Sequence, residues 1–150
     1  MNLVYSFGAL VTFKSDHVNP ALLDSFAATP LLDHEVADIL FAVDIPAEQT
    51  ELRSMLEELE TDVGTRLGDL VAQTATLSGL EAKRACHPLK GNTSSFGLAR
   101  CAAVMAHLEH GWEATPVEQR ALLLTHGQTW LTAGISALRA RYPYLAAAAN

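Results

Sequence analysis

The feature that most constrains the fold is the stretch from Pro46 to about residue 75, in which apolar side chains recur every three or four positions. That spacing places them on one face of an α-helix. Acidic residues lie mostly off this face, so the pattern predicts one long amphipathic helix that must bury its apolar side against other helices. The apolar positions are Leu52, Met55, Leu56, Leu59, Val63, Leu67, Leu70 and Val71.

A second helix is predicted to begin at Ser78, because Ser78 and Glu81 have the spacing of a capping box. Its inward side is expected to carry mostly small residues, which let a neighbouring helix approach closely. These inward residues are Ala82, Ala85, Cys86, Leu89 and Thr93.

Two further helices follow a turn near residues 92–97. The third is expected to end with Gly111 just beyond its last turn. Thr115 and Pro116 have the form of a cap and a first helical residue, so they predict a final helix that ends before Tyr142. The expected inward residues are Leu98, Cys101, Ala102, Met105 and Leu108 in the third helix, and Val117, Ala121, Leu124, Gln128, Leu131, Ile135 and Leu138 in the last.

The fold class predicted from these patterns is all-α, an antiparallel four-helix bundle with an N-terminal extension of short helices. Residues 46–142 form the bundle, residues 1–45 the extension that packs on it, and residues 143–150 a frayed tail. In the extension, Asn19 and Pro20 predict a short helix to about Ala28, and a second is expected from about Leu32 to Phe41. Residues 1–13 suit either a short strand or an apolar helix.

The distribution of charge along the chain indicates which classes of partner it can bind. The net charge is −7, with −10 in residues 1–80 and +3 in residues 81–150. An acidic chain argues against nucleic acid, whereas the basic residues around Lys83, Arg84, Lys90 and Arg100 suit an acidic protein or a phosphoryl group.

The N-terminus lacks the basic region and cleavage site of a signal peptide, and no apolar run reaches membrane-spanning length, so a cytoplasmic protein is expected. The two cysteines, Cys86 and Cys101, are expected to be free core residues.

The second predicted helix carries the residues that are candidates for catalysis. His87, Lys90 and Gly91 stand at positions i, i+3 and i+4, so they share one face. An imidazole beside a cation and a bare stretch of backbone suits a nucleophilic histidine that is approached by something bulky and anionic. Glycine inside a helix lowers helix stability by about 1 kcal/mol relative to alanine. Close approach of a partner to the backbone would explain why glycine occupies position 91.

The segment His87-x-Leu89-Lys90-Gly91-x-x-x-x-Phe96-Gly97 resembles the signature of histidine-containing phosphotransfer (HPt) domains, the intermediates of multistep phosphorelays in two-component signalling. The resemblance covers about residues 46–141. It implies that His87 accepts a phosphoryl group from the aspartate of one receiver domain and passes it to another. The implied partners are response-regulator receiver domains, which a hybrid histidine kinase can also carry. The Mg²⁺ of such a reaction belongs to the receiver, so no cofactor is implied for this chain.

The resemblance also assigns roles to other residues. Lys90 would offset the charge of the phosphoryl oxygens, and Gly91 would leave space for the receiver's loops. Glu109 in the third helix matches the position of a polar residue that hydrogen-bonds the imidazole, fixing its tautomer and leaving the other nitrogen free to attack. Lys83, Arg84 and Ser94 would face the partner, and Thr93 and Ser94 are weaker candidates for polar support. Gly97 is interpreted as a structural glycine in a tight helix–helix turn.

Pro88 departs from the family pattern, which more often has a residue with a free N–H after the histidine. Proline in a helix interior removes one hydrogen bond and crowds the carbonyl of Arg84, so a kink is expected beside His87. Such a kink would either expose the imidazole further or disturb its alignment with Lys90.

Two other classes of function remain open at this stage. A bundle that binds receivers without accepting phosphate (a pseudo-HPt) is the main alternative, because of Pro88. A metal-binding bundle is the second alternative, since His107 and His110 are spaced i, i+3 and could lie near Cys86, His87 and Cys101. The simpler interpretation is that His107 and His110 are exposed residues near the C-terminal end of a helix. The chain lacks a Gly-rich nucleotide motif, so autonomous kinase activity is not expected, and an open histidine face favours a monomer.

Overall fold

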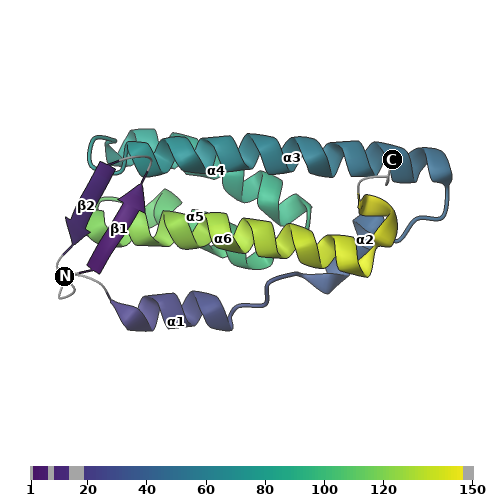
Figure 1. The fold of residues 1–150 in the computed structure, drawn as a ribbon, viewed down its shortest axis with the longest axis horizontal. Coiled ribbons are helices and arrows are strands. Elements are labelled where there is room, and N and C mark those ends of the chain that lie inside the picture. The colour runs from purple at the N-terminus through teal and green to yellow at the C-terminus, as the bar shows by residue number, and fades with distance from the viewer. Residues whose placement is uncertain (1, 7–8, 14–18, 147–150) are drawn as a thin grey trace.

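The computed structural model describes residues 2–6, 9–13 and 19–146, and side chains from residue 19 onward. Within these ranges the chain is mainly helical, as predicted, with a short strand pair at the N-terminus (Figure 1). No helix of the described ranges is long and apolar enough to cross a membrane. The elements are β1 (Asn2–Ser6), β2 (Ala9–Phe13), α1 (Pro20–Ala28), α2 (His34–Phe41), α3 (Pro46–Ala72), α4 (Gly79–Ser95), α5 (Ala99–Gly111), α6 (Val117–Arg141) and the 3₁₀-helix η2 (Pro143–Leu145).

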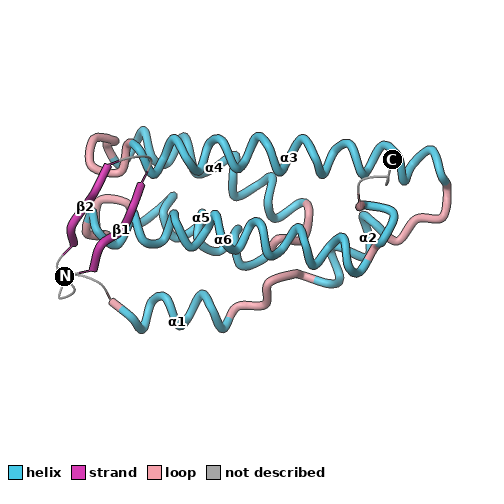
Figure 2. Tube along the Cα trace, in the orientation of Figure 1, coloured by secondary structure: helices cyan, strands magenta, loops and turns pink. Residues whose placement is uncertain are grey.

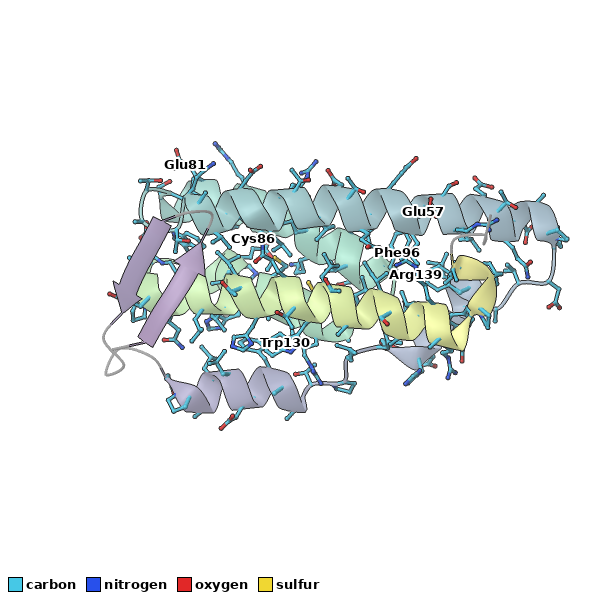
Figure 3. The ribbon with its side chains drawn as sticks, in the orientation of Figure 1. Glu57, Glu81, Cys86, Phe96, Trp130 and Arg139 are labelled. Carbon is cyan, nitrogen blue, oxygen red and sulfur yellow. The ribbon has the colours of Figure 1, made fainter. Side chains whose placement is uncertain are left out.

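The helices α3 to α6 run back and forth along the long axis of the molecule, each reversing the direction of the one before (Figure 1). The two long helices, α3 and α6, pack against each other, and α4 packs mainly against α5. Their apolar faces meet in one core, whose largest fully buried side chains include Leu56, Leu89, Met105 and Leu124. Cys86 points into this interior (Figure 3), and both cysteines are free and buried, as expected.

Most of the predicted inward positions are buried, and Ala85 and Gln128 are partly buried. Met55 is an exception, because its side chain is 41% exposed although Leu52 and Leu56 beside it are buried. At 100° per residue, Met55 lies at the margin of the stripe that Leu52, Leu56 and Leu59 define. Val117 is also 37% exposed, because it is the first residue of α6.

Helix starts follow the predicted caps at Asn19 and Ser78, whose side chains accept from the backbone N–H groups of Ala21 and Glu81. The start of α2 is two residues later than expected, because the Asp33 carboxylate accepts from Val36 N at 3.1 Å and caps the helix there.

The connection from α5 to α6 differs from the expectation. Gly111 is the last residue of α5, not the residue beyond it, and Pro116 precedes α6 instead of opening it. Thr115 does not cap α6, because its hydroxyl donates to the Gly111 carbonyl at 2.6 Å and so closes the end of α5.

The N-terminal segment contains both strands and helices. The strands β1 and β2 pair antiparallel, with Asn2 opposite Phe13 and Ser6 opposite Ala9 (Figure 2). Of the two structures that the sequence allowed for this segment, the described residues therefore adopt the strand. The two short helices are present as expected. Phe41 of α2 is fully buried among the core residues, which makes α2 part of the same core as α3 to α6.

The C-terminal segment is ordered further than predicted. Leu145 is fully buried, and the Tyr144 hydroxyl donates to the Phe41 carbonyl at 2.6 Å. The expected frayed tail is therefore wrong for residues 143–146, because an apolar side chain and a tyrosine hydroxyl both find partners in the interior. Residues 147–150 of that tail lie outside the described residues.

Candidate functional site

The site lies on α4, and the predicted capping box is present at the first turn of that helix. Ser78 Oγ accepts from Glu81 N at 3.2 Å, and Ser78 N donates to Glu81 Oε2 at 3.0 Å. From there α4 is α-helical through Pro88 to Ser95, so the proline lies inside the helix and does not end it, and the kink expected beside His87 stays a prediction. Cys86 and Leu89, which flank the proline region, are fully buried and hold the helix against its neighbours.

His87 meets Glu109 across the α4–α5 packing interface, as predicted. Its Nδ1 lies 2.6 Å from Glu109 Oε1, although the two residues are 22 positions apart in the chain. The histidine side chain is 69% exposed and the glutamate only 3%. A carboxylate can only accept, so Nδ1 carries a proton, and in the neutral ring the lone pair therefore resides on Nε2. Nε2 has no hydrogen-bond partner within the described part of the chain.

Lys90 binds the other oxygen of the same carboxylate, with its Nζ 2.6 Å from Glu109 Oε2. His110, next to Glu109 in α5, has its Nε2 3.6 Å from this oxygen. The hydrogen bond and charge of Lys90 outweigh the effect of burial and, with the hydrogen bond from His87, lower the pKa of Glu109 from its ordinary 4.5 to about 2. Glu109 is therefore ionised throughout the neutral range, in a nearly buried position between two basic side chains.

This lowered pKa predicts an acid sensitivity that the Glu109→Gln variant should lack. A carboxyl whose pKa is depressed on folding stabilises the protein above its unfolded pKa, and that contribution is lost as the pH falls from about 4.5 to about 2. Urea unfolding midpoints measured from pH 7 to pH 2 should therefore fall more steeply for the wild type than for the variant. Asp38, whose pKa is also lowered to about 2 by Arg141 and Tyr142, affects both proteins equally. Parallel curves would contradict the prediction.

The surface around His87 is a shallow depression of about 700 Å³ with a basic lining. Lys83 and Arg84 lie one turn before His87 and are exposed, as expected for residues that face a partner. Sequence reasoning missed two members, Leu80, which is 57% exposed, and His110, which is 67% exposed. Leu80 could have been found from its i, i+3 and i+4 spacing to Lys83 and Arg84, whereas His110 required the register of α5 on α4. The lining residues are Leu80, Lys83, Arg84, His87, Lys90, Glu109 and His110.

The two glycines of the motif differ in what surrounds them. A Cβ placed on Gly91 would have nothing within 4 Å, so the fold itself does not require glycine there. Gly97 has φ +75°, and its Cβ would lie 3.0 Å from the Asp33 carbonyl oxygen, which confirms its structural role in the α4–α5 turn. Its own carbonyl accepts from Asp33 N at 2.8 Å, so the same turn anchors the start of α2.

The weaker polar candidates separate into one inward and one outward residue. Thr93 is fully buried, and its hydroxyl donates to the Leu89 carbonyl at 2.7 Å, so it does not contribute to the exposed face. Ser94 is exposed, one turn beyond Lys90, and stays a candidate for contact with a partner.

The residues considered for a metal site are not gathered together. No group of three or more His, Cys, Asp or Glu in the described ranges could hold a metal ion. His107 is half-buried, contrary to the simple expectation of an exposed residue, and its ring makes an edge contact with Phe26 at a centroid distance of 5.7 Å. Burial lowers the pKa of His107 and raises those of the Cys86 and Cys101 thiols to about 12.

Comparisons of this chain with protein-family models, with curated proteins and with solved structures find no match. The geometry of the site and the motif around His87 are therefore the features that bear on function.

Proposed function

We propose that this protein is a phosphorelay intermediate of the HPt type, in which α3 to α6 form an antiparallel four-helix bundle and His87 carries the phosphoryl group. One observation carries the proposal: the exposed His87 has its Nδ1 engaged by the buried Glu109, which leaves the Nε2 lone pair free on a basic surface. An isolated surface histidine has no such partner, and a structural histidine would not be 69% exposed.

The proposed reaction is a displacement at phosphorus. The Nε2 lone pair of His87 forms the N–P bond while the bond from phosphorus to the aspartate oxygen of a receiver breaks, and the aspartate leaves as a carboxylate. The reverse displacement passes the group to a second receiver. Lys83, Arg84 and Lys90 surround the position where negative charge arrives, and cations placed there stabilise the transferring group.

The partners that suit this surface are response-regulator receiver domains, alone or within a hybrid histidine kinase. A receiver presents acidic residues and Mg²⁺ around its phosphorylated aspartate, so it supplies the metal of the reaction. The basic lining of the depression complements such a surface, and exposed Leu80 and Ser94 would widen the contact. The proposal includes a monomer that acts in the cytoplasm without binding nucleic acid or membranes, since the histidine face must stay open to successive partners.

Incubation with phosphorylated receivers tests the proposal. The expected result is one label per chain that is lost in acid and stable in alkali, as a phosphohistidine is. The label should then move to a second, unphosphorylated receiver. If the protein binds receivers and no receiver of the same cell transfers label to it, the phosphorelay role is wrong and the protein is a pseudo-HPt that acts by binding alone.

A further inference from the structure

The partner of His87 Nδ1 carries a full negative charge, which is more than orientation of the ring requires. A neutral amide oxygen would accept the same hydrogen bond and fix the same tautomer. The protein instead holds a carboxylate that is 3% exposed, and holds it ionised with Lys90 on its second oxygen. The charge of Glu109 therefore calls for a function that depends on the protonation of the ring.

We propose that Glu109 keeps the proton on Nδ1 of His87 after Nε2 has been phosphorylated, so that the phosphohistidine is held as its imidazolium form and stays ready to transfer. The inference deepens the proposed function, because it rests on His87 being the phosphorylated residue. Glu109 acts through His87, and is in this sense a positioning residue.

The proton balance of the transfer explains why the Nδ1 proton must be retained. Before attack the ring is neutral, with hydrogen on Nδ1 and a lone pair on Nε2. Forming the N–P bond consumes that lone pair and makes the ring cationic, with its proton still on Nδ1. When the group leaves, the N–P electron pair returns to Nε2 and a neutral imidazole is released. If Nδ1 had lost its proton to solvent, the leaving group would be an imidazolide anion, which is far less stable.

The charges that face the ring come from both helices of the site. Lys83, Arg84 and Lys90 on α4 disfavour a cationic ring, and His110 on α5 adds to this effect when protonated. Glu109 on α5 is the one acidic residue among those lining the depression. Its Oε1 lies 2.6 Å from Nδ1 and accepts a direct hydrogen bond from it, so its effect on the Nδ1 proton should dominate.

Lys90 should act in the opposite sense to Glu109. Its Nζ shares the carboxylate with His87 and so weakens the hold of Glu109 on the Nδ1 proton. Removal of Lys90 leaves the carboxylate to His87 alone. The pair therefore offers two variants with effects of opposite sign.

The experiment uses the full chain, labelled with ¹⁵N-histidine and phosphorylated with potassium phosphoramidate, so that no receiver is needed. The pH at which phospho-His87 loses its Nδ1 proton is followed by ¹⁵N and ³¹P NMR, with the signal assigned by its absence in His87→Gln. In Glu109→Gln this midpoint should fall by about one to two pH units, a tenfold to hundredfold change in proton affinity, because a hydrogen bond to a charged group is replaced by one to a neutral amide. In Lys90→Gln the midpoint should rise.

Circular dichroism shows whether each variant is folded, and Lys90→Gln keeps the test decisive if Glu109→Gln is not. Equal midpoints in the wild type and folded Glu109→Gln, or a lower midpoint in Lys90→Gln, would overturn the inference. So would a failure of phosphoramidate to modify His87, since Nε2 would not be the free nucleophile. If the midpoints shift as expected but no receiver transfers label, the inference stands for the phosphorylated ring and the proposed function alone is wrong.

Discussion

A His87→Gln variant is expected to take up no detectable label from a phosphorylated receiver while unfolding at the same temperature as the wild type. The loss is complete because the nitrogen that forms the N–P bond is gone, and glutamine has no nucleophile to replace it. Stability should change by less than about 0.5 kcal/mol, as is usual for exposed positions, since the side chain is 69% exposed and Glu109 keeps its ion pair with Lys90. Labelling assays with matched thermal unfolding curves check both parts.

The control for this variant is His110→Gln. His110 is 67% exposed, almost as much as His87, and it lies beside the same carboxylate. It should therefore report any general effect of removing an imidazole from the basic depression. Full labelling of His110→Gln with none of His87→Gln supports the assignment, whereas label that survives in His87→Gln would show that another residue is the acceptor.

Much of the scaffold could be predicted because its signals are local. The capping box at Ser78 fixes the start of α4, and Gly97 is required where the backbone adopts a positive φ in the following turn. Buried positions follow from helical periodicity, which also places His87 on the outward face. The contact of His87 with Glu109 was expected from the family resemblance, and the α4–α5 packing brings it about.

The features that the sequence did not predict depend on tertiary contacts, which helical periodicity does not encode. The buried Leu145 and the bond from Tyr144 to Phe41 order a segment that looks like a tail in the sequence. His110 joined the site only because α5 packs on α4 in a register that sets it beside Glu109.

Substitution of Gly91 by glutamine is expected to slow phosphotransfer by about tenfold to a hundredfold without impairing the fold. In the structure a Cβ at Gly91 meets nothing within 4 Å, so a side chain there extends into solvent and not into the protein. Glycine in a helix is less favourable than other residues by up to about 1 kcal/mol, so the variant should be at least as stable as the wild type. A docked receiver would instead meet the new side chain one turn after His87, and an overpacked contact costs about 1–3 kcal/mol. Transfer rates at subsaturating receiver, together with thermal unfolding, measure the two effects separately.

Gly64 in α3 provides the matched control, because a Cβ at Gly64 likewise meets nothing within 4 Å. It is a helical glycine outside the basic depression, so Gly64→Gln should gain stability in the same way and leave transfer unchanged. The contrast isolates the effect of side-chain bulk beside His87 from the effect of removing a glycine from a helix. Equal transfer rates for Gly91→Gln and Gly64→Gln would mean that no partner approaches closely over Gly91. The glycine would then need another explanation, and the docking geometry proposed for the receiver would be wrong even if His87 accepts the phosphoryl group.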